Sequence, residues 1–282
     1  MTVLLALVSA VAYGLSDFVG GLVSRRASVW SVAVVLQASS AVCTAVVSPL
    51  VGGSVTGGDL AWATLSGVGS GFGVCFLFRG LSRGAMAVVA PLSAVGAAVL
   101  PLVVALAGGE RPSSLDLLGI AVALPGIWLV SGGGAGHDGG PAPQSRRSGV
   151  TDGLLAGLGF GVMFVALAQV GEGSGLWPVA HGQLVAALVA AGIAVTLRAS
   201  WRPAGRRPLT SAAAAGPLGA LAVVAYTLST RTGLLSVSAV LSSLYPAATI
   251  LLAATVLHER IRRPQLVGLL LCGVTVSLLA LE

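Results

Sequence analysis

The residue of greatest chemical interest in this sequence is Asp17, which lies in the apolar stretch AYGLSDFVGG, residues 12–21. Tyr13 precedes it by four residues, so the two side chains share one face of a helix. A carboxylate in a helix at lipid depth costs on the order of 2.5–3.5 kcal/mol and commonly marks a substrate or proton path. We therefore predict that Tyr13 and Asp17 bind substrate and that Asp17 is the candidate for proton coupling. The alternative is a structural carboxylate that pairs with Arg25 or Arg26.

Two glutamines, Gln37 and Gln183, form a second candidate set, because each follows a tryptophan by about two helical turns. Amides inside apolar helices either bind substrate across a cavity or tie neighbouring helices together. Their similar positions in the two halves of the chain favour a central place, so we predict that both bind substrate. His181 is two residues from Gln183, and its alternatives are an interfacial residue and a proton relay.

A third candidate region surrounds the prolines of two apolar segments. Pro91 and Pro246 fall inside segments long enough to span a membrane. Proline there frees backbone carbonyls and permits bends, which carriers use near their binding sites. We therefore expect Ser242 and Tyr245, close to Pro246, to line a cavity and bind substrate. The alternative for the serine is a hydrogen bond to its own helix backbone.

Motifs for enzymatic and metal chemistry are missing from the sequence. The three cysteines are far apart without CxxC spacing, and there is neither an HExxH motif nor a Walker lysine, since the chain has no lysine. We therefore expect no catalytic residue, no metal and no cofactor. Arg79 and Arg83 are expected to reach the membrane interface. Solvated positions are expected for Asp59, Asp116, Asp138, Asp152, Glu172 and Glu282.

The composition decides what kind of protein must position these residues. Of the 282 residues, 56% are hydrophobic and only 9% are charged, whereas a soluble domain carries about 25% charge. The chain is therefore predicted to be an all-α integral membrane protein. A span needs about 20 apolar residues, which predicts ten helices, at 3–23, 30–51, 60–81, 84–107, 114–132, 150–171, 177–198, 210–231, 234–257 and 264–281. The Gly/Pro-rich stretch 133–148 is expected to be a flexible linker between units 1–132 and 149–282.

Residues 84–130 and 233–279 repeat one pattern at an offset of 149 positions. Each copy has an apolar segment, a charged turn and a second apolar segment, and the turns are Glu110-Arg111 and Glu259-Arg260. Five helices per unit is an odd number, so two tandem copies would enter the membrane in opposite orientations, as an inverted repeat. The Glu-Arg pairs are expected to fix these turns, and the alternative is a gate charge.

The arginines predict the orientation. With ten helices, the odd-numbered loops hold thirteen arginines and the even-numbered loops hold only Arg111 and Arg231. Because cytoplasmic loops collect arginine, both termini are expected outside the cell. The net charge of +6 therefore reflects topology, and no nucleic-acid partner is expected.

The segments GERPSSLDLLGIAVALPGIWLV (109–130) and HERIRRPQLVGLLLCGVTVSLL (258–279) resemble EamA-type repeats of the drug/metabolite transporter superfamily. The resemblance implies a secondary-active transporter of small metabolites or drugs, often an exporter, in the cell (inner) membrane. It implies a central cavity between the repeats, a small-molecule substrate, the lipid bilayer as surroundings, and a monomer or homodimer. Family members commonly have both termini in the cytoplasm, opposite to what the arginines favour. The alternative function is a membrane-embedded lipid-handling protein, with an arginine-lined lateral opening, or an enzyme.

Overall fold

Long apolar helices make up the part of the chain that the computed structural model describes, which is residues 1–24, 27–82, 86–131, 143–198, 206–258 and 260–281. The first half holds α1 (Thr2–Ser24), α2 (Val29–Val51), α3 (Gly57–Ser82), α4 (Met86–Ala107) and α5 (Ser114–Val130). The second half holds α6 (Pro143–Ala168), the short η1 (Glu172–Ser174), α7 (Trp177–Thr196), α8 (Arg206–Thr232), α9 (Leu235–Ser242), α10 (Tyr245–Val256) and α11 (Arg263–Ala280). No strand occurs among these residues.

The helices confirm the predicted all-α membrane class. Within the described residues, nine apolar segments are long enough to cross a bilayer, with α9 and α10 counted together, and α5 adds a shorter apolar helix of 17 residues. Large apolar side chains point away from the protein along these helices; Leu50 is 84% exposed and Leu270 is 63% exposed. Such a surface fits hydrocarbon, because apolar area in contact with water is unfavourable.

Two predicted boundaries differ from the structure. The ninth predicted helix, 234–257, is divided: α9 ends at Ser242, and α10 begins at Tyr245 after a turn. Pro246 lies in the first turn of α10, where its missing N–H is tolerated. Residues 143–148 of the predicted linker are helical and open α6, while 133–142 lie outside the described residues.

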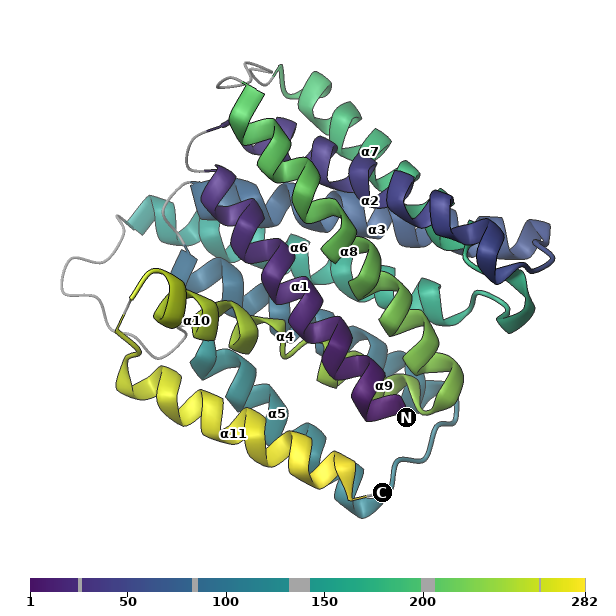
Figure 1. Cartoon of the computed structure of the whole chain (residues 1–282). Helices are drawn as coiled ribbons and strands as arrows, with labels where there is room; N and C mark the ends of the chain where they lie inside the picture. Colours follow the sequence, from purple (N-terminus) through teal and green to yellow (C-terminus); the bar gives the residue numbers. More distant parts are fainter. Residues whose placement is uncertain (25–26, 83–85, 132–142, 199–205, 259, 282) are drawn as a thin grey trace.

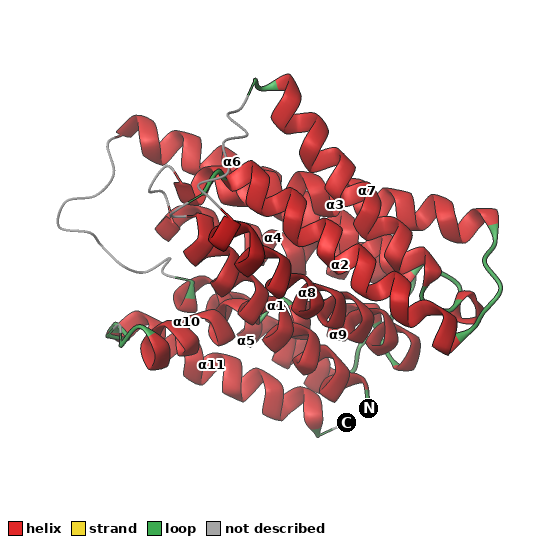
Figure 2. Ribbon diagram, turned by 45° about the horizontal axis from the view of Figure 1, so that its top comes forward, coloured by secondary structure: helices red, strands yellow, loops and turns green. Residues whose placement is uncertain are grey.

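The two halves pack mainly against each other, and their pairings match when the halves are exchanged. Helix α3 packs on α6 and α7, as α8 packs on α1 and α2. Helix α4 packs on α6, as α9 and α10 pack on α1. Helices α5 and α11 pair along one edge of the bundle, as both views show (Figures 1 and 2). These pairings agree with a repeat, and the inverted orientation of the two halves stays a prediction.

Glycines let the crossing helices approach closely. A Cβ placed on Gly96 of α4 would lie 2.8 Å from the Cα of Gly157 in α6. A Cβ on Gly69 of α3 would lie 2.6 Å from the carbonyl oxygen of Gly159. Both distances are too short for a carbon atom, so these helix contacts require glycine.

Three acids that we expected to be solvated are instead buried, two of them in the first turn of a helix. Asp116 forms a capping box with Ser113, and each backbone N–H donates to the other side chain at 3.1 Å. Asp59 accepts from the backbone N–H groups of Thr56 and Gly171, both at 2.8 Å. Asp152, with 1% of its side chain exposed, forms an ion pair with Arg79. For each of these acids, hydrogen bonds within the protein replace the hydrogen bonds to water that burial removes. The pattern of apolar residues in the sequence does not reveal these internal bonds.

Candidate functional site

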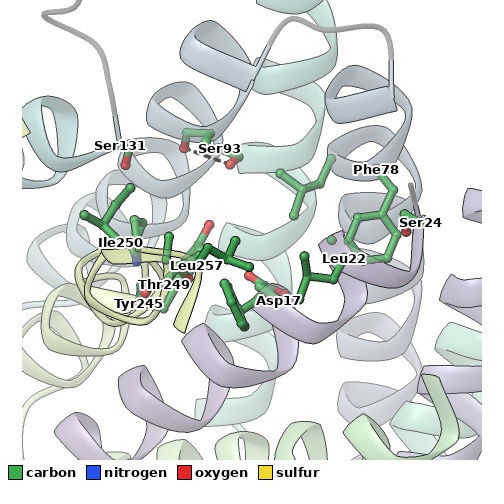
Figure 3. Close-up of a pocket in the computed structure, with 16 residues that line it drawn as sticks. Asp17, Leu22, Ser24, Phe78, Ser93, Ser131, Tyr245, Thr249, Ile250 and Leu257 are labelled. Carbon is green, nitrogen blue, oxygen red and sulfur yellow. Dashed lines mark hydrogen bonds between the residues drawn. The ribbon is translucent and has the colours of Figure 1, made fainter. Parts of the chain in front are cut away.

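A cavity of about 450 Å³ lies between α1, α4 and α10 and has Asp17 in its wall. Figure 3 shows Asp17 on α1 facing Tyr245 and Thr249 on α10. Ser93 of α4 and the rings of Phe18 and Phe78 also line it. The structure therefore brings together three parts predicted separately: the acid of the first helix, the proline-containing α4, and the segment around Pro246.

The close contact of α1 with α10 positions Asp17. A Cβ on Gly14, three residues before Asp17, would lie 2.6 Å from the Cβ of Ala248 and 2.7 Å from the carbonyl oxygen of Tyr245. The hydroxyl of Thr249 donates to the carbonyl of Gly14 at 3.2 Å. The turn between α9 and α10 brings Tyr245 to this crossing at the start of α10. Bare backbone at Gly14 thus fixes the distance between the acid and α10.

A cluster of aromatic rings packs around Tyr245, next to Asp17. The ring centroid of Tyr13 lies 6.5 Å from that of Tyr245 and 6.1 Å from that of Phe164. Phe164 stacks on Tyr226 at 4.3 Å, and the Tyr226 hydroxyl donates to the carbonyl of Phe164 at 3.0 Å. Tyr13 itself does not line the cavity. Its ring packs against that of Tyr245, which does.

Asp17 is half-buried and has no hydrogen bond or ion pair with any residue that the structure describes. The hydroxyl of Tyr245 is buried and lies near the Ser93 hydroxyl, but it forms no hydrogen bond of good geometry with the described residues. Ser93 is satisfied, since its hydroxyl donates to the carbonyl of Ala90 at 3.0 Å. Buried polar groups normally have partners, so an acid and a phenol without them indicate a place for a ligand or water.

Ser242, the other candidate of this segment, lies outside the cavity. It ends α9, is fully buried, and its hydroxyl has no hydrogen-bond partner among the described residues. The alternative we considered, a bond to its own helix backbone, is therefore not formed in this structure.

Gln37 and Gln183 lie in a separate polar cluster between α2, α3 and α7. The amide of Gln37 donates to the hydroxyl of Ser70 at 2.8 Å. The hydroxyl of Thr44 donates to the side-chain carbonyl of Gln183, also at 2.8 Å. The void beside them measures only about 10 Å³, room for about one water molecule. In this structure, their contacts are those of groups that join helices.

The cavity extends toward one end of the bundle, and we call that end its mouth. Its outermost lining residues are Ser24, Ser131 and Leu257, at the ends of α1, α5 and α10. The loops that follow these helices are odd-numbered, and thirteen of the fifteen arginines lie in these odd-numbered loops or in the helix ends beside them. The cavity therefore runs from Asp17 toward the arginine-rich end.

Hydrogen bonds between the two halves close the opposite end. Glu110, in the turn after α4, accepts from the backbone N–H groups of Leu235 and Ser236 at 2.8 and 3.2 Å, and from the Ser236 hydroxyl at 2.8 Å. Thr2 and Thr232 share a hydrogen bond of 3.0 Å. Glu110 thus caps the first turn of α9 in the other half, beyond the role in its own turn that we expected. Glu259 lies outside the described residues.

Sequence reasoning missed several lining residues. Phe18, Phe78, Ser131 and Thr249 line the cavity, yet each type is ordinary in an apolar helix. For Thr249, the sequence did contain an indication, because this residue lies one turn after Tyr245 and shares its helix face. Among the described residues, no group of three His, Cys, Asp or Glu side chains could hold a metal.

Comparison with known proteins identifies the relatives of this arrangement. Residues 147–281 match the model of the EamA-like transporter family, which confirms the predicted resemblance in the second half of the chain. A solved structure, described only as a crystal structure of a protein, superposes with a TM-score of 0.70 at 18% identity and covers 97% of each chain. At this identity the likeness concerns the fold alone. No curated protein matches the sequence.

Proposed function

The second half of this chain belongs to the EamA-like transporter family, and from this premise we propose a secondary-active carrier that exports small metabolites or drugs. The observation that carries the proposal is the cavity of about 450 Å³ with Asp17 in its wall. Pockets of a few hundred Å³ hold drug-sized solutes. The mouth at one end and the hydrogen-bonded contact at the other support alternating access, in which the two halves rock to exchange the open end.

Coupling to protons belongs to the same proposal, with Asp17 as the proton carrier. Among the described residues that line the cavity, Asp17 is the one acid. A carboxyl that takes up a proton when the solute leaves would link the two fluxes. The other titratable groups that face it are the phenols of Tyr13 on its own helix and Tyr245 on α10.

The test begins with a thermal-unfolding screen of the purified protein against metabolites and drugs. A compound that binds only the folded state raises its apparent stability. Uptake of a hit is then measured in liposomes with an imposed pH gradient, with wild type and Asp17→Asn compared. We expect the variant to fold normally and to lose gradient-driven flux. Undiminished gradient-driven flux in Asp17→Asn would rule out its role as proton carrier.

The orientation forms part of the export proposal. The arginine count supports a cytoplasmic mouth and termini outside the cell. Leu281 is 75% exposed, so Leu281→Cys offers a label at the C-terminal end, with wild type as the control for the native cysteines. In intact cells we expect modification by a membrane-impermeant maleimide; modification only after lysis would reverse the orientation.

The lipid-handling alternative predicted an opening lined by arginine. The described residues that line the cavity include no arginine, so no observation favours that function over transport.

A further inference from the structure

The carboxylate of Asp17 sets the kind of solute that the cavity can hold. It has no ion pair or hydrogen bond with the residues that the structure describes, and its surroundings at this depth are largely apolar. A charge held away from water is unfavourable unless an opposite charge or hydrogen-bond donors compensate it. A positively charged solute in the cavity would supply that compensation, whereas an anionic solute would face repulsion.

The remaining wall suits the body of such a solute. Phe18 and Phe78 line the same cavity as Asp17. Aromatic faces attract cations that approach within about 6 Å. The hydroxyls of Ser93 and Thr249 are neutral and can accept from an ammonium group. No basic side chain occurs among the described lining residues, and the single charge that these residues carry is the negative charge of Asp17.

We propose that this cavity binds amphipathic organic monocations, with the Asp17 carboxylate as their counter-ion and the aromatic and aliphatic wall holding their apolar part. The proposal names the solute class for the carrier function above and rests on it. The cavity volume of about 450 Å³ lies within the range of sites for drug-sized ligands, so it leaves room for an apolar body beside the charged group.

The test uses two probes of nearly equal size and opposite charge, tetraphenylphosphonium and tetraphenylborate. Equilibrium binding of each is measured on the full-length protein in one detergent, where partition into micelles is the same for every variant. Wild type should bind the phosphonium saturably and show no saturable binding of the borate. Asp17→Asn should weaken phosphonium binding at least about tenfold, since it removes one partner of a desolvated charge pair.

Three variants separate the role of the charge from a general effect on folding. Asp17→Glu keeps the carboxylate and should retain saturable phosphonium binding. Glu172→Gln removes an acid that is exposed, outside the cavity, and should bind like wild type. Gly21 lines the cavity, and a Cβ there would meet no atom within 4 Å. Gly21→Leu should therefore fold and lose binding, because its side chain fills the space.

Two results would overturn the inference: saturable borate binding as strong as that of the phosphonium, or undiminished phosphonium binding in Asp17→Asn. Flux is measured separately, so the proposals can fail independently. A protein that carries a neutral or anionic solute but shows no saturable phosphonium binding contradicts the solute class alone. A protein that binds the phosphonium as expected but moves no solute contradicts the carrier function alone.

Discussion

Glu110 is one of the residues that join the two halves of the chain at the closed end. Its carboxylate accepts three hydrogen bonds from Leu235 and Ser236, at 2.8 to 3.2 Å. These donors belong to the first turn of α9, where helix N–H groups favour a negative charge. Because the bonds cross from one half to the other, Glu110 has to release α9 whenever this end opens.

We expect Glu110→Gln to loosen the closed end. An amide of the same size keeps one acceptor but loses the charge, and hydrogen bonds to charged groups contribute about 1.5–3 kcal/mol. Thermal unfolding in detergent should shift downward. Ser238 is fully buried in α9, and a cysteine placed there should react faster with maleimide when Glu110→Gln is present. Glu172→Gln, an exposed acid at the same end, is the matched control; equal shifts in both variants would contradict a special role for Glu110.

Among single residues, the sequence drew attention to Asp17 and Tyr245, because a carboxylate at lipid depth and a phenol beside a proline are rare and costly placements. The structure places both at one cavity, and their role in binding stays a prediction. It did not predict that Asp59, Asp116 and Asp152 are buried. Each of these gains its partner from a cap or a distant helix, as Asp152 does from Arg79 on α3. A single sequence shows the charge of such a residue, but it does not show the hydrogen bond that replaces water.

The crossing of α1 and α10 is the element contact on which the cavity depends. We expect Gly14→Ala to force these helices apart, since the added Cβ would lie 2.6 Å from the Cβ of Ala248. Overpacking of this kind costs about 1–3 kcal/mol. Gly21→Ala on the same helix is the control, because a Cβ there meets nothing within 4 Å. Thermal unfolding that places both variants at the same stability would show that this crossing tolerates extra volume.

The break between α9 and α10 shows what periodicity cannot resolve. Hydropathy joins residues 235–256 into one apolar segment, because Ser242, Ser243 and Leu244 interrupt the helix without adding charge. Pro246 signals a possible break, yet Pro91 lies inside the continuous α4. Proline is compatible with both a continuous helix and a broken one. The break lies between α9 and α10, which pack against α1 and α4. The apolar spans were therefore predictable, whereas the break that shapes the cavity was not.

At the scale of the whole molecule, the predicted repeat agrees with which helices touch. The pairing of α3 with α6 and α7 has its counterpart in the pairing of α8 with α1 and α2. Under the proposed alternating access, this structure, with hydrogen bonds between the halves at the end away from the cavity mouth, is one of the two states that the halves exchange. The second state would close the arginine-rich end and release the bonds at Glu110 and Thr2.

A disulfide across the closed end tests whether this end opens. Thr2 of α1 and Thr232 of α8 belong to different halves, and their hydroxyl oxygens lie 3.0 Å apart. In a background without Cys43, Cys75 and Cys272, we expect the oxidised Thr2→Cys/Thr232→Cys variant to stop transport, because its halves can no longer separate there. It should still bind solute through the mouth at the other end, and reduction should restore the flux.

The control disulfide joins Ser229 and Ser238, whose hydroxyl oxygens lie 2.8 Å apart at the same end of the bundle. Both residues belong to the second half, so oxidised Ser229→Cys/Ser238→Cys constrains α8 against α9 without tying the halves together. Its flux should respond far less to oxidation. If the Thr2–Thr232 cross-link forms completely and flux continues at the uncross-linked rate, then transport proceeds without opening this end, and rocking of the two halves about Asp17 is excluded.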